Sequence, residues 1–307
     1  MKIRTDKLTI EKEYARCIAS LTRAGILTFL PGYRRTGITG SDGKEYPVPT
    51  REQVEKLLDN NRELANTKAL QGFGRLELVP MAMPLHRLLG LLEAAVVRHA
   101  AKGQIYQTRC NASDPLVPVR VNNDKQVWVW DTLKQLTDTD ELVYFPMEYS
   151  VNHRGQTKAE AAGNTRICAV QGWSVGLVED VPVMPKPGQG QILAGRKQLE
   201  TGFAPREYLE TLQQEPYRGE TGKTLEDFIT GFLIRLEETD EVSHDRYDNN
   251  SVWCLGQYVK IEYAELVPTG WWHREMGRMR LDMHRTGNKL CTRNWGASTT
   301  VRLPGSE

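Results

Sequence analysis

The 307-residue chain lacks the long apolar run that a membrane-spanning helix requires. Such a helix needs roughly 18 or more consecutive apolar residues. The longest apolar concentration, residues 85–101, is interrupted by His86, Glu93 and Arg98, and it predicts an amphipathic helix. Residues 1–13 carry charges but no apolar segment of a secretory signal. We therefore expect no membrane insertion and no export by an ordinary signal peptide, while a virion or cell-surface location stays open.

Paired cysteines and metal-binding spacings are also missing. The five cysteines lie far apart, and none forms a C-x-x-C pair or joins a Cys/His cluster at zinc spacing. Isolated cysteines in an odd number predict reduced, mostly buried thiols. The run Asp248-Asn249-Asn250 offers oxygen donors but no spaced ligand loop, so we expect a turn there. The sequence implies no metal and no cofactor, and it leaves calcium binding open.

Net charge is almost absent, because 40 Lys and Arg face 39 Asp and Glu. A disordered chain combines low hydrophobicity with a large net charge, whereas this one has 39% hydrophobic residues, seven Trp and eleven Tyr. These residues can form a core. The length fits one large domain or two of modest size.

Sequence motifs for catalysis and nucleotide binding are either incomplete or lack the neighbouring secondary structure that they require. Residues 190–197 (GQILAGRK) have the spacing of a phosphate-binding loop, but Arg196 stands where that motif needs lysine. Residues 217–224 (YRGETGKT) begin with Tyr217 in place of glycine, and no predicted strand precedes them. The nucleophile elbow G-x-S-x-G is missing, and acidic runs such as 237–241 are typical of solvated helix ends. We therefore predict that the protein is not an enzyme.

Hydrophobic periodicity predicts a first portion of helices and a hairpin. The predicted helices are residues 9–27, a helix that begins after Thr50 with Gln53 completing a capping box, and residues 85–101 after Pro84. The turn Ser41-Asp42-Gly43 predicts a hairpin over residues 37–49, and alternation predicts a strand over residues 73–79. We assign this portion to residues 1–110.

The second portion, residues 111–307, is richer in strand and turn signals. Its predicted elements are short strands at 127–130 and 142–145, a brief helix at 158–162, a strand at 166–178, a loop at 182–195, helices at 204–214 and 224–238, and strands within 251–303. Thr224 and Asp227 are expected to cap the last helix. Because strands and helices do not alternate regularly, the order favours an α+β class.

The segment 270–302 (GWWHREMGRMRLDMHRTGNKLCTRNWGASTTVR) concentrates charge and aromatic residues. It holds six Arg, one Lys and three Trp against two acidic residues, a surplus of five positive charges in a chain of net charge +1. Helical spacing is weak, strand alternation is partial and four glycines divide it, so we expect loops hung between short strands. Rigid aromatics with Arg, His and Asn on loops are typical of binding surfaces.

Two other interpretations of this segment stay open. Trp is also a core residue, so the segment could form a final pair of Trp-rich core strands with its arginines in solvent. Arg with interleaved Trp could also stack on the bases of single-stranded nucleic acid and contact its phosphates. A neutral chain with almost no Lys in this segment makes nucleic acid an unexpected partner, and such binding would weaken steeply with salt.

Four stretches carry a resemblance to a known family. They are residues 71–85 (QGFGRLELVPMAMPL), residues 127–146 (VWVWDTLKQLTDTDELVYFP), residues 195–199 (GRKQL), and an ending in which Trp272 and Arg274 precede Gly296 and Val301-Arg302. The chain resembles the variable proteins of diversity-generating retroelements, in the form found in archaeal viruses and uncultivated bacteria and archaea. The resemblance implies a C-type lectin fold whose last segment is rewritten by error-prone reverse transcription at template adenines.

The resemblance also implies roles for residues of the segment 267–303. Scaffold positions would be Trp272, Arg274, Leu281, Gly296 and Val301. Variable, ligand-facing positions would be Gly270, Trp271, His273, Glu275, Met276, Gly277, Met279, Arg280, Asp282, His284, Thr286, Asn288, Thr292 and Asn294. The implied function is recognition of a protein or glycan on a cell surface, with Trp as anchor and Arg as planar hydrogen-bond donor.

An enzyme is the alternative from a different class. The fold resemblance extends to formylglycine-generating-type oxidases, which use a pair of active cysteines. Cys254 and Cys291 would be the candidates here. A catalytic thiol needs a lowered pKa and access to solvent, so the environment of these cysteines discriminates between the two functions.

Overall fold

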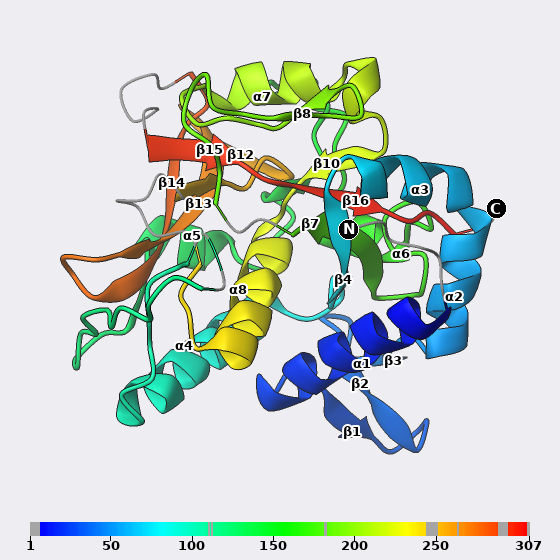
Figure 1. The fold of residues 1–307 in the computed structure, drawn as a ribbon, viewed down its shortest axis with the longest axis horizontal. Coiled ribbons are helices and arrows are strands. Elements are labelled where there is room, and N and C mark those ends of the chain that lie inside the picture. Colours follow the sequence, from blue (N-terminus) through cyan, green and yellow to red (C-terminus); the bar gives the residue numbers. More distant parts are fainter. Residues whose placement is uncertain are drawn as a thin grey trace.

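Helices and mostly antiparallel sheets follow one another without regular alternation, which makes the protein α+β as predicted (Figure 1). The structure is a computed structural model that describes residues 7–109, 111, 113–180, 183–243, 251–262, 264–287 and 294–305. The helices in these ranges are α1 (Lys7–Arg23), α2 (Arg51–Asn60), α3 (Arg62–Leu70), α4 (Leu85–Ala101), α5 (Asp131–Leu136), α6 (Lys158–Gly163), α7 (Pro205–Leu212) and α8 (Leu225–Thr239). None of these described helices is both long and apolar enough to cross a membrane.

Two small sheets lie apart from the main ones. Strands β1 (Thr28–Leu30), β2 (Arg35–Thr39) and β3 (Glu45–Pro47) form a three-stranded antiparallel sheet, and β8 (Ile192–Leu193) pairs with β9 (Arg196–Lys197). The predicted hairpin over residues 37–49 is confirmed by the β2–β3 pair, in which Gly37 lies opposite Pro47.

A four-stranded antiparallel sheet joins the two predicted portions of the chain. Its order is β10 (Glu220–Gly222), β16 (Thr299–Arg302), β7 (Ser174–Glu179) and β4 (Phe73–Val79). β4 lies before the boundary predicted at residue 110 and pairs with β7, which lies after it. One large hydrophobic core likewise contains residues from both portions, so the two portions pack as one unit.

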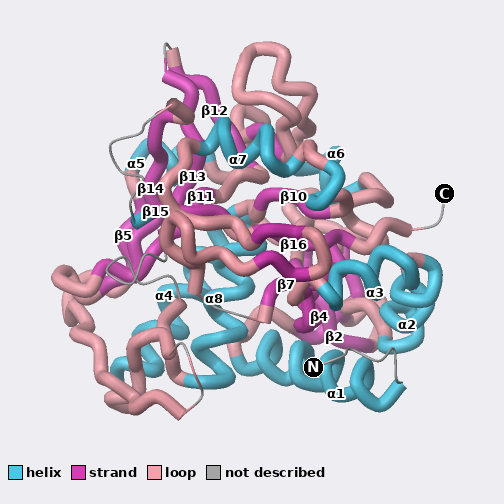
Figure 2. The backbone as a smooth tube through the Cα atoms, turned by 45° about the horizontal axis from the view of Figure 1, so that its top comes forward, coloured by secondary structure: helices cyan, strands magenta, loops and turns pink. Residues whose placement is uncertain are grey.

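A seven-stranded sheet carries the strands of the C-terminal segment other than β16. Its strands are β5 (Val127–Val129), β6 (Val143–Tyr144), β11 (Ser251–Trp253), β12 (Gln257–Ile261), β13 (Ala264–His273), β14 (Arg278–Arg285) and β15 (Trp295–Ala297). The order is β15-β11-β13-β12-β6, with β14 pairing with both β13 and β5. Figure 2 shows the two larger sheets as separate groups of strands, with α1 and α4 along one side.

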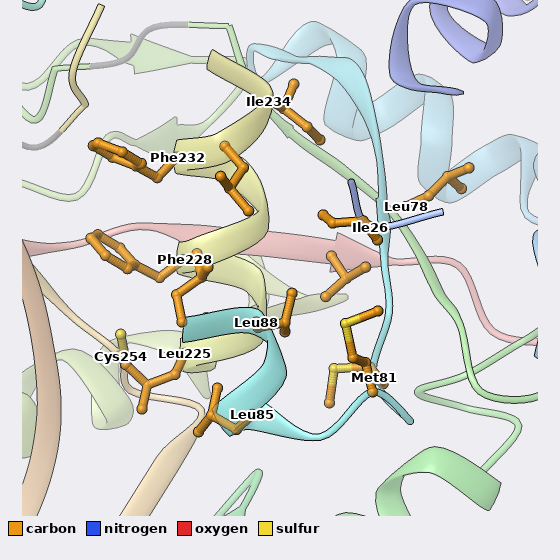
Figure 3. Close-up of a cluster of buried hydrophobic side chains, with 14 of the residues drawn as sticks. Ile26, Leu78, Met81, Leu85, Leu88, Leu225, Phe228, Phe232, Ile234 and Cys254 are labelled. Atoms are coloured by element: carbon orange, nitrogen blue, oxygen red, sulfur yellow. The ribbon is translucent and has the colours of Figure 1, made fainter. Parts of the chain in front are cut away.

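Helix α8 stands between the two larger sheets. Phe228 and Phe232 project from one side of this helix, while Ile234 projects from the other side toward β4, and Leu78 lies on the far side of that strand (Figure 3). All four side chains are at most 5% exposed. Burying large apolar side chains on both sides of one helix ties the two sheets together through the hydrophobic effect.

A buried ion network links β9 and β10 to α3. The guanidinium of Arg196, 1% exposed, donates to Glu220 from Nε and Nη2 at 2.7 and 2.8 Å, and to Glu179 from Nη1 at 2.7 Å. Lys68 donates to the same Glu220 at 2.7 Å. Arg196 also lies over the ring of Phe73, 4.7 Å from its centroid. Arg196, which belongs to the phosphate-loop-like run 190–197, therefore forms buried ion pairs within the fold.

Most local predictions are confirmed. The capping boxes at Thr50 and Thr224 are present, and β4 covers the predicted residues 73–79. The strand predicted over 166–178 is largely wrong, because the strand that forms, β7, begins only at Ser174. Gly172 has a φ of 77°, and this left-handed residue turns the chain just before the strand begins.

Candidate functional site

The C-terminal segment is built around one long hairpin. β13 and β14 pair over eight positions, from Leu266 opposite Arg285 to His273 opposite Arg278. The expectation of loops between short strands is therefore wrong for this part of the segment. Both faces of the hairpin are largely buried, and strands buried on both faces do not show the simple alternation of apolar and polar residues.

One face of the hairpin packs on the core beside α8. Trp272 and Leu281, which the resemblance assigns to the scaffold, lie on this face with no exposure. Gly270 and Met279 lie on it as well, and a Cβ atom at Gly270 would be 2.3 Å from the Phe228 ring. Gly270 and Met279 were expected to face a ligand, and we correct that assignment because they face the core.

The opposite face gathers aromatic and polar side chains. Trp271 and His284 are brought to Trp295 of β15, with ring centroids 5.2 and 4.4 Å from the Trp295 ring. Trp253 of β11 completes the group, 4.7 Å from Trp295. Trp271 is only 1% exposed, so it packs inside this group and does not reach a ligand from the surface. The interpretation of the segment as Trp-rich core strands fits this part of it.

Arg280 marks the accessible edge of this face. Its guanidinium lies 4.4 Å from the ring centroid of Trp128 and 5.3 Å from that of Trp271. Asp282 accepts hydrogen bonds from Nη2 and Nε of Arg280 at 2.7 and 3.1 Å. The Arg280 side chain is 26% exposed. We call Trp128, Trp271, Arg280 and Asp282 the Arg280 patch, in which a planar cation is held between two rings by a carboxylate.

The tip of the hairpin carries two exposed side chains. Glu275 and Met276 are exposed, and Met276 reaches 39%. Arg274 anchors the tip through a 2.8 Å hydrogen bond to Gln107, as a scaffold residue would. Gly277 has a φ of 62°, and a Cβ atom there would lie 2.8 Å from the carbonyl oxygen of Arg120. Only glycine fits without strain, so we withdraw Gly277 from the variable positions.

The remaining predicted positions are spread over several environments. His273 is 5% exposed beside the tip, and Thr286 is 3% exposed, where its hydroxyl accepts from Arg206. Asn294 is exposed, whereas Asn288 and Thr292 lie outside the described residues. Gly296 and Val301 are buried, and a Cβ atom at Gly296 would lie 2.7 Å from the sulfur of Met184.

The sequence-based assignment of binding residues did not include three tryptophans that pack on this face of the hairpin, namely Trp128, Trp253 and Trp295. Trp128 belongs to the run VWVW at residues 127–130, whose alternation predicts a strand with one aromatic face. That signal indicates a tryptophan on a sheet face, but the pairing of β5 with β14, which brings Trp128 opposite Arg280, depends on residues far away in the chain.

One of the two candidate thiols of the alternative enzyme, Cys254, lies in the described part of the chain. Cys254 is fully buried, and this burial raises its pKa well above the usual value. A catalytic thiol needs the opposite shift, so Cys254 has the environment of a structural thiol. Cys291 and the run 248–250 lie outside the described residues. Within the described part of the chain, no three His, Cys, Asp or Glu side chains are grouped to hold a metal ion.

Comparison of the chain with protein-family models, curated proteins and solved structures finds no match. The hairpin geometry is therefore what bears on function. It brings together Trp271, Arg280, Asp282 and His284 on one face, and it separates them from Gly270 and Met279 on the other.

Proposed function

We propose that this protein recognises a ligand through the Arg280 patch and the exposed hairpin tip. The proposed ligand is a protein or glycan on a cell surface. The proposal includes a C-type lectin-like fold and diversification of the C-terminal segment by a retroelement. The observation that carries it is the register of the β13–β14 hairpin, which separates a core face from a second face of different chemistry.

The register supports this division of labour within one hairpin. Trp272 and Leu281 fill the core, while Arg280 and Asp282 alternate with them on the other face. Arg280 is partly exposed and the tip residues Glu275 and Met276 are exposed, and substitutions at such positions usually change stability by less than about 0.5 kcal/mol. Such a hairpin can therefore change its ligand contacts while its core face stays constant.

The chemistry of the Arg280 patch also supports binding. Tryptophan and arginine carry a large share of the energy at known interfaces. Asp282 and the two rings already hold the Arg280 guanidinium in place, so less side-chain entropy is lost when a ligand binds. Trp271 contributes as the buried support of this cation, and Met276 at the tip offers apolar contact area.

The proposed C-type lectin-like fold is supported by the pairing of the first and last strands of residues 174–302. The closing strand β16 pairs antiparallel with the opening strand β7, with Val301 opposite Leu177. Helix α8 and the seven-stranded sheet lie between these strands in the sequence. Both ends of the segment are thus fixed in one sheet, and the hairpin is presented by the other.

Sequencing of the gene from its source population tests the diversification. We expect substitutions at codons 280, 282, 275 and 276, concentrated at adenine-derived positions. Codons 272 and 281 serve as controls within the same window, because their side chains fill the core. Equal variation on both faces of the hairpin, or a uniform window, would contradict the proposal.

A binding measurement tests the ligand-binding function separately. The probes are an array of immobilised glycans and intact cells of the source population. We expect Arg280→Ala to lower the affinity for a bound probe by about 30-fold, the loss typical of an interface hot spot. Arg285→Ala is the matched control. Arg285 lies on the same strand as Arg280, but the alternation of the strand places it on the other face of the hairpin. Equal affinities of the two variants would contradict the assigned face. Trp271→Ala is unsuitable, since its burial predicts a stability loss of about 3–5 kcal/mol.

A further inference from the structure

A cavity of about 90 Å³, lined by both apolar and polar side chains, lies among β4, β7 and α8, distinct from the hairpin face. Its lining includes Glu77, Asp180, Lys223, Gly231, Ser243 and Ser298. Since a water molecule takes about 30 Å³ of liquid volume, the space suits roughly three waters or one molecule of about five non-hydrogen atoms. Asp180 is exposed and marks the side of the cavity that meets solvent.

Several polar groups at this cavity have no partner within the described part of the chain. Glu77 is 4% exposed, and its Oε2 accepts no hydrogen bond. The hydroxyls of Ser243 and Ser298 are buried and equally unpartnered. Lys223 is 8% exposed and has no carboxylate within 4.0 Å among the described residues. Burying such groups is costly unless something pairs with them, so a partner from outside the chain is expected.

The other charges that face the cavity are already paired. Arg16 and Arg75 both form ion pairs with Glu238, and Arg235 forms one with Glu241. The carboxylate of Glu179 accepts from Arg196, as described above. Asp180 remains at the solvent side, where water can hydrate it. The unpaired charges inside are thus the carboxyl of Glu77 and the ammonium of Lys223.

Gly231 keeps the space between these two groups open. It lies inside α8, where alanine is the stronger helix former. A Cβ atom at this position would lie 2.8 Å from Oε1 of Glu77 and 3.8 Å from Nζ of Lys223. Glycine weakens the helix at this position, and it leaves open the gap between Glu77 and Lys223 that a methyl group would enter.

We propose that this cavity binds a small zwitterion of the size of glycine. Its carboxylate accepts hydrogen bonds from the Lys223 ammonium, and its ammonium donates to the Glu77 carboxylate. The hydroxyls of Ser243 and Ser298 supply further donors and acceptors. A simple anion of this size would be repelled by Glu77, and a simple cation would be repelled by Lys223. A molecule with both charges pairs both groups at once.

The electrostatics of Glu77 agree with this assignment. Burial raises the pKa of its carboxyl, and the positive charge of Lys223 across the cavity opposes that rise. A ligand ammonium at the same carboxyl would oppose it further, so binding should strengthen as Glu77 loses its proton.

Isothermal titration of the full chain with glycine, acetate and methylammonium tests the proposal. We expect glycine to bind at least about 10-fold more tightly than either half-ligand, since each charged hydrogen bond contributes that order of affinity. Gly231→Ala should remove binding while the helix is kept. The matched control is Gly90→Ala in α4, where an added Cβ meets no atom within 4 Å.

Each other outcome overturns a stated part of the proposal. Acetate that binds as tightly as glycine would make this an anion site. Unchanged glycine affinity in Gly231→Ala would place the ligand elsewhere. If no probe binds, the cavity holds water only. In the supporting case, Glu77→Gln lowers glycine affinity and raises acetate affinity, because the repulsion of an anion is removed.

Discussion

Replacement of Arg196 by methionine should destabilise the protein strongly. Arg196 supplies two hydrogen bonds to Glu220 and one to Glu179, and its side chain is 1% exposed. Methionine fills a similar volume but leaves the carboxylates without this cation. Removing one partner of a buried ion pair typically costs about 3–5 kcal/mol. Lys68 still pairs with Glu220, which places the expected loss toward the lower end of that range.

Urea denaturation gives the free energy of unfolding by linear extrapolation and measures this loss directly. The matched control is Arg62→Met, whose ion pair with Asp59 leaves both side chains 63% exposed. Exposed pairs contribute at most about 1 kcal/mol, so the control should change stability little. A loss below about 1 kcal/mol for Arg196→Met would refute the view that the buried network holds β9 and β10 in place.

Two further predictions follow from buried titratable groups. The raised pKa of Glu77 means that the folded state binds its proton more tightly, so its contribution to stability is lost as pH rises above the unfolded value near 4.5. Glu77→Gln should therefore gain stability relative to the natural protein from pH 4 to pH 7 in urea titrations; a pH-independent difference would contradict this. Burial raises the pKa of Cys17 to about 12, and it raises the pKa of Cys254 well above the usual value of a thiol. Alkylation mapped by mass spectrometry should modify both at least ~100-fold more slowly in native than in denatured protein, and fast native labelling of Cys254 would favour the enzyme alternative.

Features encoded by neighbouring residues were predictable. The helix capping boxes of Thr50 with Gln53 and of Thr224 with Asp227 depend on residues only three positions apart, and both are present. The strand over residues 73–79 was predicted from the alternation of the run FGRLELV. Each of these signals is local, so distant contacts did not alter it.

Features that depend on distant partners were not predictable. Trp271 and Trp272 are adjacent and both buried, because one packs among the aromatic side chains and the other on the core beside α8. The sequence therefore hides the alternation that would have revealed β13. Likewise, Arg196 is an unusual buried charge whose partner Glu220 comes 24 residues later. Only the assembled fold shows why the cation is there.

The order in which strands enter the four-stranded sheet has a consequence for folding. β16 lies between β10 and β7, although it comes after every other element that the structure describes. Until β16 arrives, β7 and β10 each present an unpaired edge that another chain could join. Contacts between residues far apart in sequence also slow folding. We therefore expect this protein to fold slowly and to depend on low concentration or chaperones while that gap is open.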